Sequence, residues 1–207
     1  LQSNWKDAGM LGGWGVYQVE FGNGFFLAIN YAGEVYKSMD GEKWDSLNVS
    51  VENDDGMEFE YYHEYFYLYD GDGTFLGSKD GVEWTKIEVG SGVVYGIAYG
   101  NETYYALVGK MSSDLNTNYV TCLMSSQDGC RWTVLNENIP QTEYAGLVYG
   151  KEQLVSVSRY STEEILILNV DGSVFSGFEV KEREKQNNIN EIDYANEHYI
   201  MHDSYNI

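Results

Sequence analysis

Residues 38–44 read SMDGEKW, and two later stretches repeat the pattern: residues 78–84 read SKDGVEW and residues 126–132 read SQDGCRW. Each stretch places Ser, Asp, Gly and Trp at the same positions, S-x-D-G-x-x-W. An Asp side chain can accept backbone N–H groups within its own turn, and Gly supplies the positive φ that such a turn requires. The three stretches therefore predict three copies of one turn, each joining two β-strands.

A fourth copy at residues 169–175 departs from the pattern, because Asn169 replaces the Ser and Phe175 replaces the Trp. The aromatic residue that closes each copy is expected to pack between sheets. The turn residues to which the pattern assigns a structural role are Ser38, Asp40, Gly41, Trp44, Ser78, Asp80, Gly81, Trp84, Ser126, Asp128, Gly129, Trp132, Asp171, Gly172 and Phe175.

The closing aromatics are spaced by 40, 48 and 43 residues, which is the period of a repeat architecture. Each repeat contains three short runs rich in Tyr, Phe, Val and Ile before the turn and one run after it, as in a four-stranded propeller blade. No stretch shows sustained helical periodicity. The sequence therefore predicts an all-β protein, a β-propeller whose blades each have four antiparallel strands.

The ends of the chain favour a closed ring of five blades. Trp5 lies 39 residues before Trp44, in phase with the later aromatics, and residues 192–200 match the first two strands of the repeat. We expect the N- and C-termini to share one blade, so that residues 1–207 form a single domain. The alternative is a slice of a longer propeller.

The repeated turns resemble the Asp-box, or BNR, repeat of the sialidase-like propellers. The resemblance covers nearly the whole chain and implies that the turns lie on the outer rim, away from a central pocket. Sialidases hold the sugar carboxylate with three Arg residues. This chain has only Arg131, Arg159 and Arg183, and Arg131 lies inside a turn, so the sequence favours a noncatalytic protein over a sialidase.

Composition excludes two classes of partner. Against 12 Lys and Arg stand 33 Asp and Glu, a net charge of −21, and no basic cluster interrupts the acidic field. Nucleic acids and anionic membranes need local positive charge. The chain contains neither a signal peptide nor an apolar run long enough to cross a membrane. We expect a mature or excised domain of an extracellular or cell-surface bacterial protein.

The plentiful aromatics, 19 Tyr and 5 Trp, favour a glycan or a protein as ligand. The repeat places several loops on one propeller face, together with an insertion at residues 110–119. The ligand-binding residues predicted there are Trp14, Tyr31, Asp70, Asp72, Tyr144, Arg159 and Tyr160. Two alternatives stay open: an assembly factor resembling the photosystem stability factors, and a glycoside hydrolase using carboxylates such as Glu20, Glu60 and Asp193.

No cofactor is expected. Asp70 and Asp72, beside the acidic residues 52–55, are candidate Ca²⁺ ligands, but they lack the spacing of a Ca²⁺ loop, and an ordinary hairpin turn is favoured. His63, His198 and His202 form no metal pattern. The two cysteines, Cys122 and Cys130, flank one predicted turn, and the sequence leaves open whether they form a disulfide.

Overall fold

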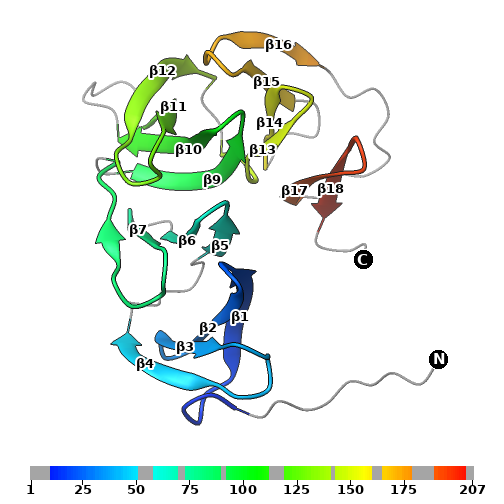
Figure 1. Cartoon of the computed structure of the whole chain (residues 1–207). Coiled ribbons are helices and arrows are strands. Elements are labelled where there is room, and N and C mark those ends of the chain that lie inside the picture. Colours follow the sequence, from blue (N-terminus) through cyan, green and yellow to red (C-terminus); the bar gives the residue numbers. More distant parts are fainter. Residues whose placement is uncertain are drawn as a thin grey trace, which may run out of the picture. The chain divides into compact units, whose positions relative to one another are not determined.

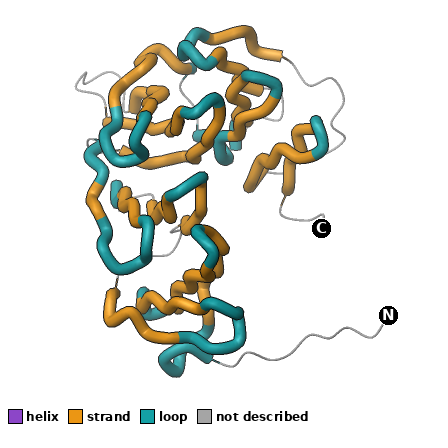
Figure 2. The backbone as a smooth tube through the Cα atoms, viewed as in Figure 1, coloured by secondary structure: helices purple, strands orange, loops and turns teal. Residues whose placement is uncertain are grey.

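The structure, a computed structural model, describes residues 10–50, 58–69, 73–89, 92–111, 119–140, 143–159, 165–178 and 189–203. Its regular elements within these ranges are all β-strands, joined by turns and loops (Figure 2). They form four antiparallel sheets of four strands and one of two strands (Figure 1). The prediction of an all-β propeller built from four-stranded blades is confirmed.

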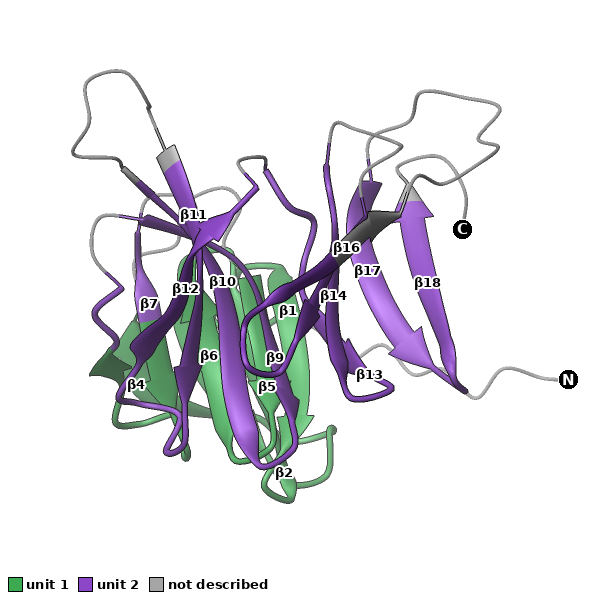
Figure 3. Ribbon diagram, turned by 90° about the horizontal axis from the view of Figure 1, so that it is seen from above, with its two compact units in different colours: residues 1–69, 76–86 green, residues 70–75, 87–207 purple. Residues whose placement is uncertain are grey.

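The chain divides into two compact units, which we describe separately (Figure 3). Unit 1 comprises residues 1–69 and 76–86, and unit 2 comprises residues 70–75 and 87–207. The single domain, the count of five blades and the shared blade remain predictions, since Trp5 lies outside the described residues.

Unit 1 contains two sheets. The strands of the first are β1 (Val16–Gly22), β2 (Phe25–Asn30), β3 (Glu34–Ser38) and β4 (Asp45–Ser50). The strands of the second are β5 (Glu58–Tyr62), β6 (Tyr65–Tyr69), β7 (Phe75–Ser78) and β8 (Thr85–Lys86), of which only Phe75 is assigned to unit 2. In both sheets the strands pair in chain order, which is the meander expected of a blade.

Unit 2 contains two further four-stranded sheets and the two-stranded one. The third sheet has β9 (Gly92–Gly100), β10 (Thr103–Met111), β11 (Tyr119–Ser126) and β12 (Thr133–Ile139). The fourth has β13 (Val148–Gly150), β14 (Gln153–Val157), β15 (Ile165–Asn169) and β16 (Val174–Phe178). The last has β17 (Ile189–Ala195) and β18 (His198–Asp203), where the sequence predicted the first two strands of another repeat.

Two-residue turns join the first two strands of the sheets. In unit 2 these turns are Asn101–Glu102, Lys151–Glu152 and Asn196–Glu197, and all six residues have positive φ. Two consecutive positive φ values define the type I′ turn, whose twist matches the twist of paired strands. The chain therefore folds back at the same point in each repeat, and the hairpin register repeats with it.

A repeated contact locks neighbouring sheets together within each unit. The ring of Tyr61 lies against Gly22 in unit 1, while in unit 2 Tyr149 lies against Gly100 and Tyr194 against Gly150. A Cβ atom built on any of these glycines would lie 2.0–2.6 Å from the tyrosine ring. Glycine at the end of the first strand thus allows the next sheet to approach closely.

Apolar side chains fill the space between the sheets. In unit 1, Leu27 and Ile29 of the first sheet pack against Phe59 and Phe66 of the second. In unit 2, the cores between sheets are built in the same way by residues including Leu107, Leu154 and Ile192. No disulfide joins Cys122 and Cys130, the two cysteines of the third repeat.

Candidate functional site

The first S-x-D-G-x-x-W turn is closed by its own side chains. Ser38 Oγ accepts the N–H of Gly41 at 2.8 Å and donates to Asp40 Oδ1 at 3.2 Å. Asp40 Oδ1 also accepts the backbone N–H groups of the two residues after Gly41, both at 2.9 Å. Trp44 Nε1 donates to the Gly41 carbonyl at 3.2 Å. Every residue of the pattern therefore has a bonding role within the turn.

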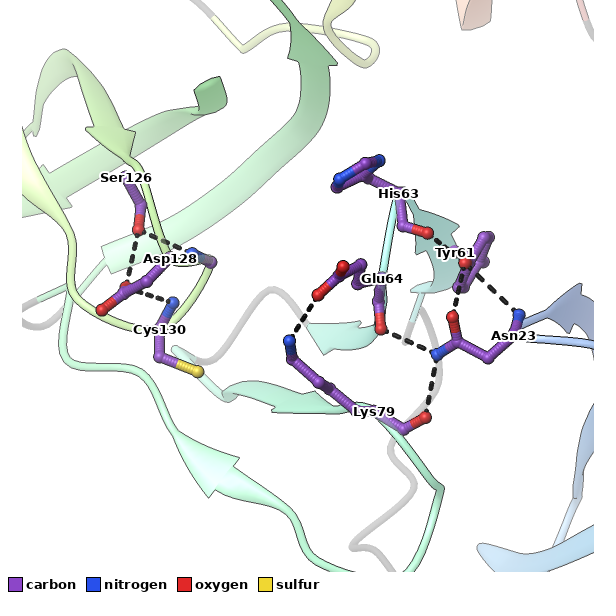
Figure 4. A network of polar contacts seen from close by, with 9 residues as sticks. Asn23, Tyr61, His63, Glu64, Lys79, Ser126, Asp128 and Cys130 are labelled. Atoms are coloured by element: carbon purple, nitrogen blue, oxygen red, sulfur yellow. Dashed lines mark hydrogen bonds and ion pairs between the residues drawn. The ribbon is translucent and has the colours of Figure 1, made fainter. Parts of the chain in front are cut away.

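The second and third turns repeat this geometry. Figure 4 shows the third, in which Asp128 accepts from Ser126 at 3.2 Å and from the N–H of Cys130 at 3.0 Å. The backbone N–H groups of Arg131 and Cys130 lower the pKa of Asp128 to about 2. Arg131 Nε also contacts Asp128 Oδ2 at 2.8 Å, so this arginine belongs to the turn, as the sequence indicated. These contacts support a structural role for the carboxylates.

The fourth turn is built differently. Asp171 Oδ1 accepts the N–H of Ser173 at 2.9 Å and its hydroxyl at 2.6 Å, and Asn169 N donates to the Ser173 carbonyl at 2.9 Å. Phe175 was expected to pack between sheets, yet 56% of its surface is exposed. That expectation is wrong, because a phenyl ring cannot make the indole N–H bond to the turn glycine that the other three copies use.

Two of the predicted ligand-binding residues lie together in unit 1. Trp14 and Tyr31 are 56% and 61% exposed, and the Tyr31 N–H donates to the carbonyl of Gly15 at 3.0 Å. The ring of Tyr17 meets that of Tyr31 edge-on, with centroids 5.5 Å apart. Met10, 65% exposed, lies just before this loop in the chain. We call Trp14, Tyr17 and Tyr31 the aromatic corner.

A buried asparagine holds the backbone beneath the aromatic corner. Asn30, fully buried at the end of β2, donates to the Leu11 carbonyl at 3.0 Å and to Glu34 Oε2 at 2.7 Å. Its Oδ1 accepts the N–H groups of Ala32 and Glu34. The amide of Asn30 and the hydroxyl of Tyr36 lower the pKa of Glu34 and keep it charged. The exposed rings therefore stand on a hydrogen-bonded frame, which sequence reasoning missed.

The other predicted binding residues divide into two groups. Asp70, Asp72 and Tyr160 lie outside the described residues. Tyr144 and Arg159 are described and belong to unit 2. Arg159 is exposed, and its N–H donates to the Glu143 carbonyl at 2.8 Å. The convergence of these loops on one face remains a prediction.

Tyr144 requires a correction. It is 2% exposed, its ring packs edge-on against Tyr95, and its hydroxyl donates to the Pro140 carbonyl at 2.8 Å. An isolated β-bridge to Ser158 extends the fourth sheet to this position, so the ring turns into the core. Tyr144 is therefore a core residue and is unavailable to a ligand on the surface.

The insertion of the third repeat is described only at its ends. Lys110 pairs with Val120 and Met111 with Tyr119, so β10 and β11 run into the insertion as paired strands. Residues 112–118 lie outside the described part of the chain.

A group of carboxylates lies at the junction of β1, β5 and β6 in unit 1. Burial raises the pKa of Glu60 to about 7, hydrogen bonds from Tyr69 and Tyr62 counter this rise, and the charges of Glu58 and Glu20 add to it. The hydroxyl of Tyr69 donates to Glu60 Oε2. Burial also raises the pKa of Glu20. Glu60 and Glu20 were the unit 1 members of the predicted hydrolase carboxylates.

Glycoside hydrolysis requires two carboxyl groups in different protonation states. A retaining or inverting glycosidase combines a protonated acid with an ionised carboxylate, so the environments of the two groups push their pKa values apart. Here burial raises the pKa of both Glu20 and Glu60, and the shift is large at Glu60. Asp193, the third candidate, belongs to unit 2 and lies 3.2 Å from His202. The hydrolase alternative therefore stays a prediction.

Metal-binding clusters and membrane-spanning helices are absent from the described ranges. Among their His, Cys, Asp and Glu residues, no three lie close enough together to hold a metal ion. The candidate Ca²⁺ ligands Asp70 and Asp72 are not among them. Within the same ranges no helix is long and apolar enough to span a membrane.

The fold and its repeated turns define the class of protein: a β-propeller. More narrowly, residues 18–162 match the family model of the DUF6242 beta propeller domain, and the chain belongs to this family. The match establishes the propeller, while the resemblance to sialidase-like repeats stays a prediction. A comparison with curated proteins gave no match.

Several solved structures share the fold at low sequence identity. YCF48 bound to D1 peptide aligns with a TM-score of 0.56 at 14% identity, covering 87% of this chain and 58% of that one. The computationally designed Ika8 protein gives 0.58 at 12%, covering 92% and 56%. A nidogen/laminin complex gives 0.57 at 14%, covering 92% and 72%. The chain thus spans less than two thirds of the first two structures.

Proposed function

We propose that this protein is a noncatalytic binding module that holds a protein partner through the aromatic corner. The observation that carries the proposal is that Trp14 and Tyr31, each more than half exposed, lie on two loops that a backbone hydrogen bond from Tyr31 to Gly15 joins, beside buried Asn30, which bonds to the Leu11 carbonyl. Trp and Tyr dominate the residues that contribute most to protein binding. Rings that are ordered before binding lose little conformational entropy on contact.

We propose a polypeptide as the partner in preference to a glycan. Two structures with the same fold are complexes whose descriptions name polypeptides, YCF48 with D1 peptide and nidogen with laminin. At 14% identity these structures show the shared fold alone, and they illustrate that a propeller can hold a polypeptide. An assembly or scaffold role is one form of the proposed activity. We place the protein outside the cell or on its surface, where a strongly acidic domain stays soluble.

The partner class can be tested with the whole chain. A displayed peptide library, a glycan array and a set of aryl-glycosides would be presented to the same preparation. Selective capture of peptides supports the proposal. Selective binding of a glycan would show that the partner is a glycan and contradict a protein partner. Turnover of an aryl-glycoside would contradict the noncatalytic assignment.

The position of the site is then tested on a peptide that the library yields. Trp14→Ala and Tyr31→Ala should each weaken its binding at least about tenfold, as expected for aromatic anchors, while the melting temperature stays unchanged. Phe175→Ala is the matched control, since Phe175 is a similarly exposed aromatic outside the corner. Full affinity in both corner variants would move the site elsewhere.

A further inference from the structure

A charged carboxylate lies beside the aromatic corner. Glu34, the first residue of β3, is part-buried, and its Oε2 accepts hydrogen bonds from Asn30 Nδ2 at 2.7 Å and from the Tyr36 hydroxyl at 2.8 Å. These hydrogen bonds lower the pKa of Glu34, so the group is ionised at neutral pH. The second oxygen, Oε1, takes part in none of the hydrogen bonds between described residues. The carboxylate therefore keeps acceptor capacity for a donor from outside the chain.

The loop that carries Trp14 lies against this carboxylate. A Cβ atom built on Gly12 would lie only 2.3 Å from Glu34 Oε2, so the backbone of the loop approaches the carboxyl group closely. Two residues later, the Trp14 N–H donates to the Leu11 carbonyl at 3.1 Å, and this carbonyl also accepts from Asn30 at 3.0 Å. The indole and the carboxylate are thus joined through one short loop.

The described residues leave the charge of Glu34 without a cation. The ion pairs among them all involve other carboxylates. Residues 10–36 contain no Lys or Arg. The next basic residue, Lys37, places its ammonium over the ring of Phe25, 3.6 Å from the centroid. A cation therefore already binds an aromatic face in this sheet, whereas Glu34 has no such partner within the described ranges.

We infer that Glu34 and the aromatic corner together bind a basic side chain, Arg or Lys, of the polypeptide partner. The inference rests on the proposed function, to which it adds the chemistry of the partner. A ring face attracts a guanidinium or ammonium group, and a carboxylate oxygen accepts its N–H in a charge-assisted hydrogen bond. Tyr31, which bonds to Gly15 beside Trp14, supplies a second ring at the same loops.

Desolvation of Glu34 makes the site selective. A partner that covers the aromatic corner also removes water from the part-buried carboxylate, and an unpaired charge loses solvation free energy there. A basic side chain compensates this loss, whereas an apolar one leaves it uncompensated and an acidic one adds repulsion. The net charge of −21 acts in the same direction at long range, because it attracts basic segments and repels acidic ones.

A peptide with a single changed group tests the inference on the whole chain. An array of peptides with Arg, Lys, Leu or Glu at each position in turn selects the probe, and we expect capture of those with Arg or Lys. The best Arg peptide is then titrated by calorimetry beside its citrulline form, in which a neutral urea group replaces the guanidinium. Citrulline should weaken binding to the parent chain at least about tenfold, as the loss of a charged partner does.

Glu34→Gln tests whether this carboxylate causes the preference. The difference between the Arg and citrulline forms should fall below about threefold in this variant, because groups in contact are coupled in a double-mutant cycle. Asp45→Asn is the matched control, since it removes a carboxylate from an exposed position of β4 in the same sheet and should keep the full difference. If Glu34→Gln does not fold, the carboxyl carbon resonance of Glu34 in the parent chain replaces it. This resonance should shift with the Arg peptide and stay in place with the citrulline form.

Three results would overturn the inference. They are equal affinity of the Arg and citrulline forms for the parent chain, an undiminished difference in Glu34→Gln, and selection of Leu or Glu peptides over basic ones. In each case the proposed function still stands if Trp14→Ala and Tyr31→Ala weaken binding of the selected peptide. Full affinity in both corner variants would instead contradict the proposed function itself.

Discussion

The first and second sheets of unit 1 are copies of one repeat, yet residues at equivalent positions in the two sheets differ in burial. Val19 is 44% exposed, whereas Phe59 at the equivalent position is fully buried. Phe26 is half-buried and Phe66 is inaccessible. Phe59 and Phe66 of the second sheet pack against the first sheet, whereas Val19 of the first sheet reaches solvent. The repeat therefore defines which residues can be buried, and the neighbouring sheet determines whether they are.

The largest expected effect compares the two phenylalanines. Phe66→Ala should lower the free energy of unfolding by about 3–5 kcal/mol, because it leaves a cavity in a filled core. Phe26→Ala should cost clearly less, since its ring is partly exposed already. Urea denaturation of both variants measures the difference. Equal losses would contradict this explanation.

The second effect compares the equivalent carboxylates Glu60 and Glu20. Glu60 has its pKa raised from 4.5 to about 7, so the folded state binds its proton more tightly than the unfolded state does. Its contribution to stability is complete below pH 4.5 and falls as the pH rises to 7, by on the order of 3 kcal/mol. Denaturation of Glu60→Gln should show a flatter pH profile across this window.

Glu20→Gln provides the control for that experiment. Burial raises the pKa of Glu20 in the same direction, without the large shift seen at Glu60. Its variant should keep most of the pH dependence of the parent chain. An unchanged profile in Glu60→Gln would contradict the assignment of the effect to this group.

The smallest effect is expected in the S-x-D-G-x-x-W turns, which have the same hydrogen bonds in the first and second sheets. Asp80 Oδ1 accepts two backbone N–H groups at 2.8 and 3.0 Å, like its counterpart Asp40. Asp80→Ala should cost about 1–3 kcal/mol through these unsatisfied donors. Thermal denaturation should show a loss of the same sign for Asp40→Ala and a lesser one for Asp171→Ala, whose turn uses fewer backbone donors. Lost partner binding at an unchanged melting temperature would give the turns a functional role instead.

Sequence reasoning succeeded where a residue acts within its own turn or strand. Ser38, Asp40 and Gly41 bond to one another, so their spacing alone was sufficient to predict the turn. It failed where burial depends on distant parts of the chain. Tyr144 was predicted to lie in a ligand-binding loop, but a β-bridge to Ser158 places it in the core. Phe175 replaces a Trp in the pattern and remains exposed.

The candidate site was predictable in part. Trp14 and Tyr31 were identified because the repeat places their loops at the end of a sheet, and the structure brings them together at Gly15. The frame beneath them was not predictable, because the hydrogen bonds of Asn30 link residues of two loops across the end of β2. A signal was nevertheless present, since Asn at a strand end beside a turn commonly bonds to the backbone.

By itself, the sequence determined the all-β class, the four-stranded blade and the chemistry of the turns, because these depend on strand periodicity and on hydrogen bonds between residues close in the chain. The tertiary structure alone decided which aromatic rings are buried and which stay exposed. It also decided the raised pKa of Glu60, since desolvation and Coulomb interactions depend on how sheets from different repeats pack. Equivalent residues such as Phe21 and Tyr61 acquire different roles for the same reason.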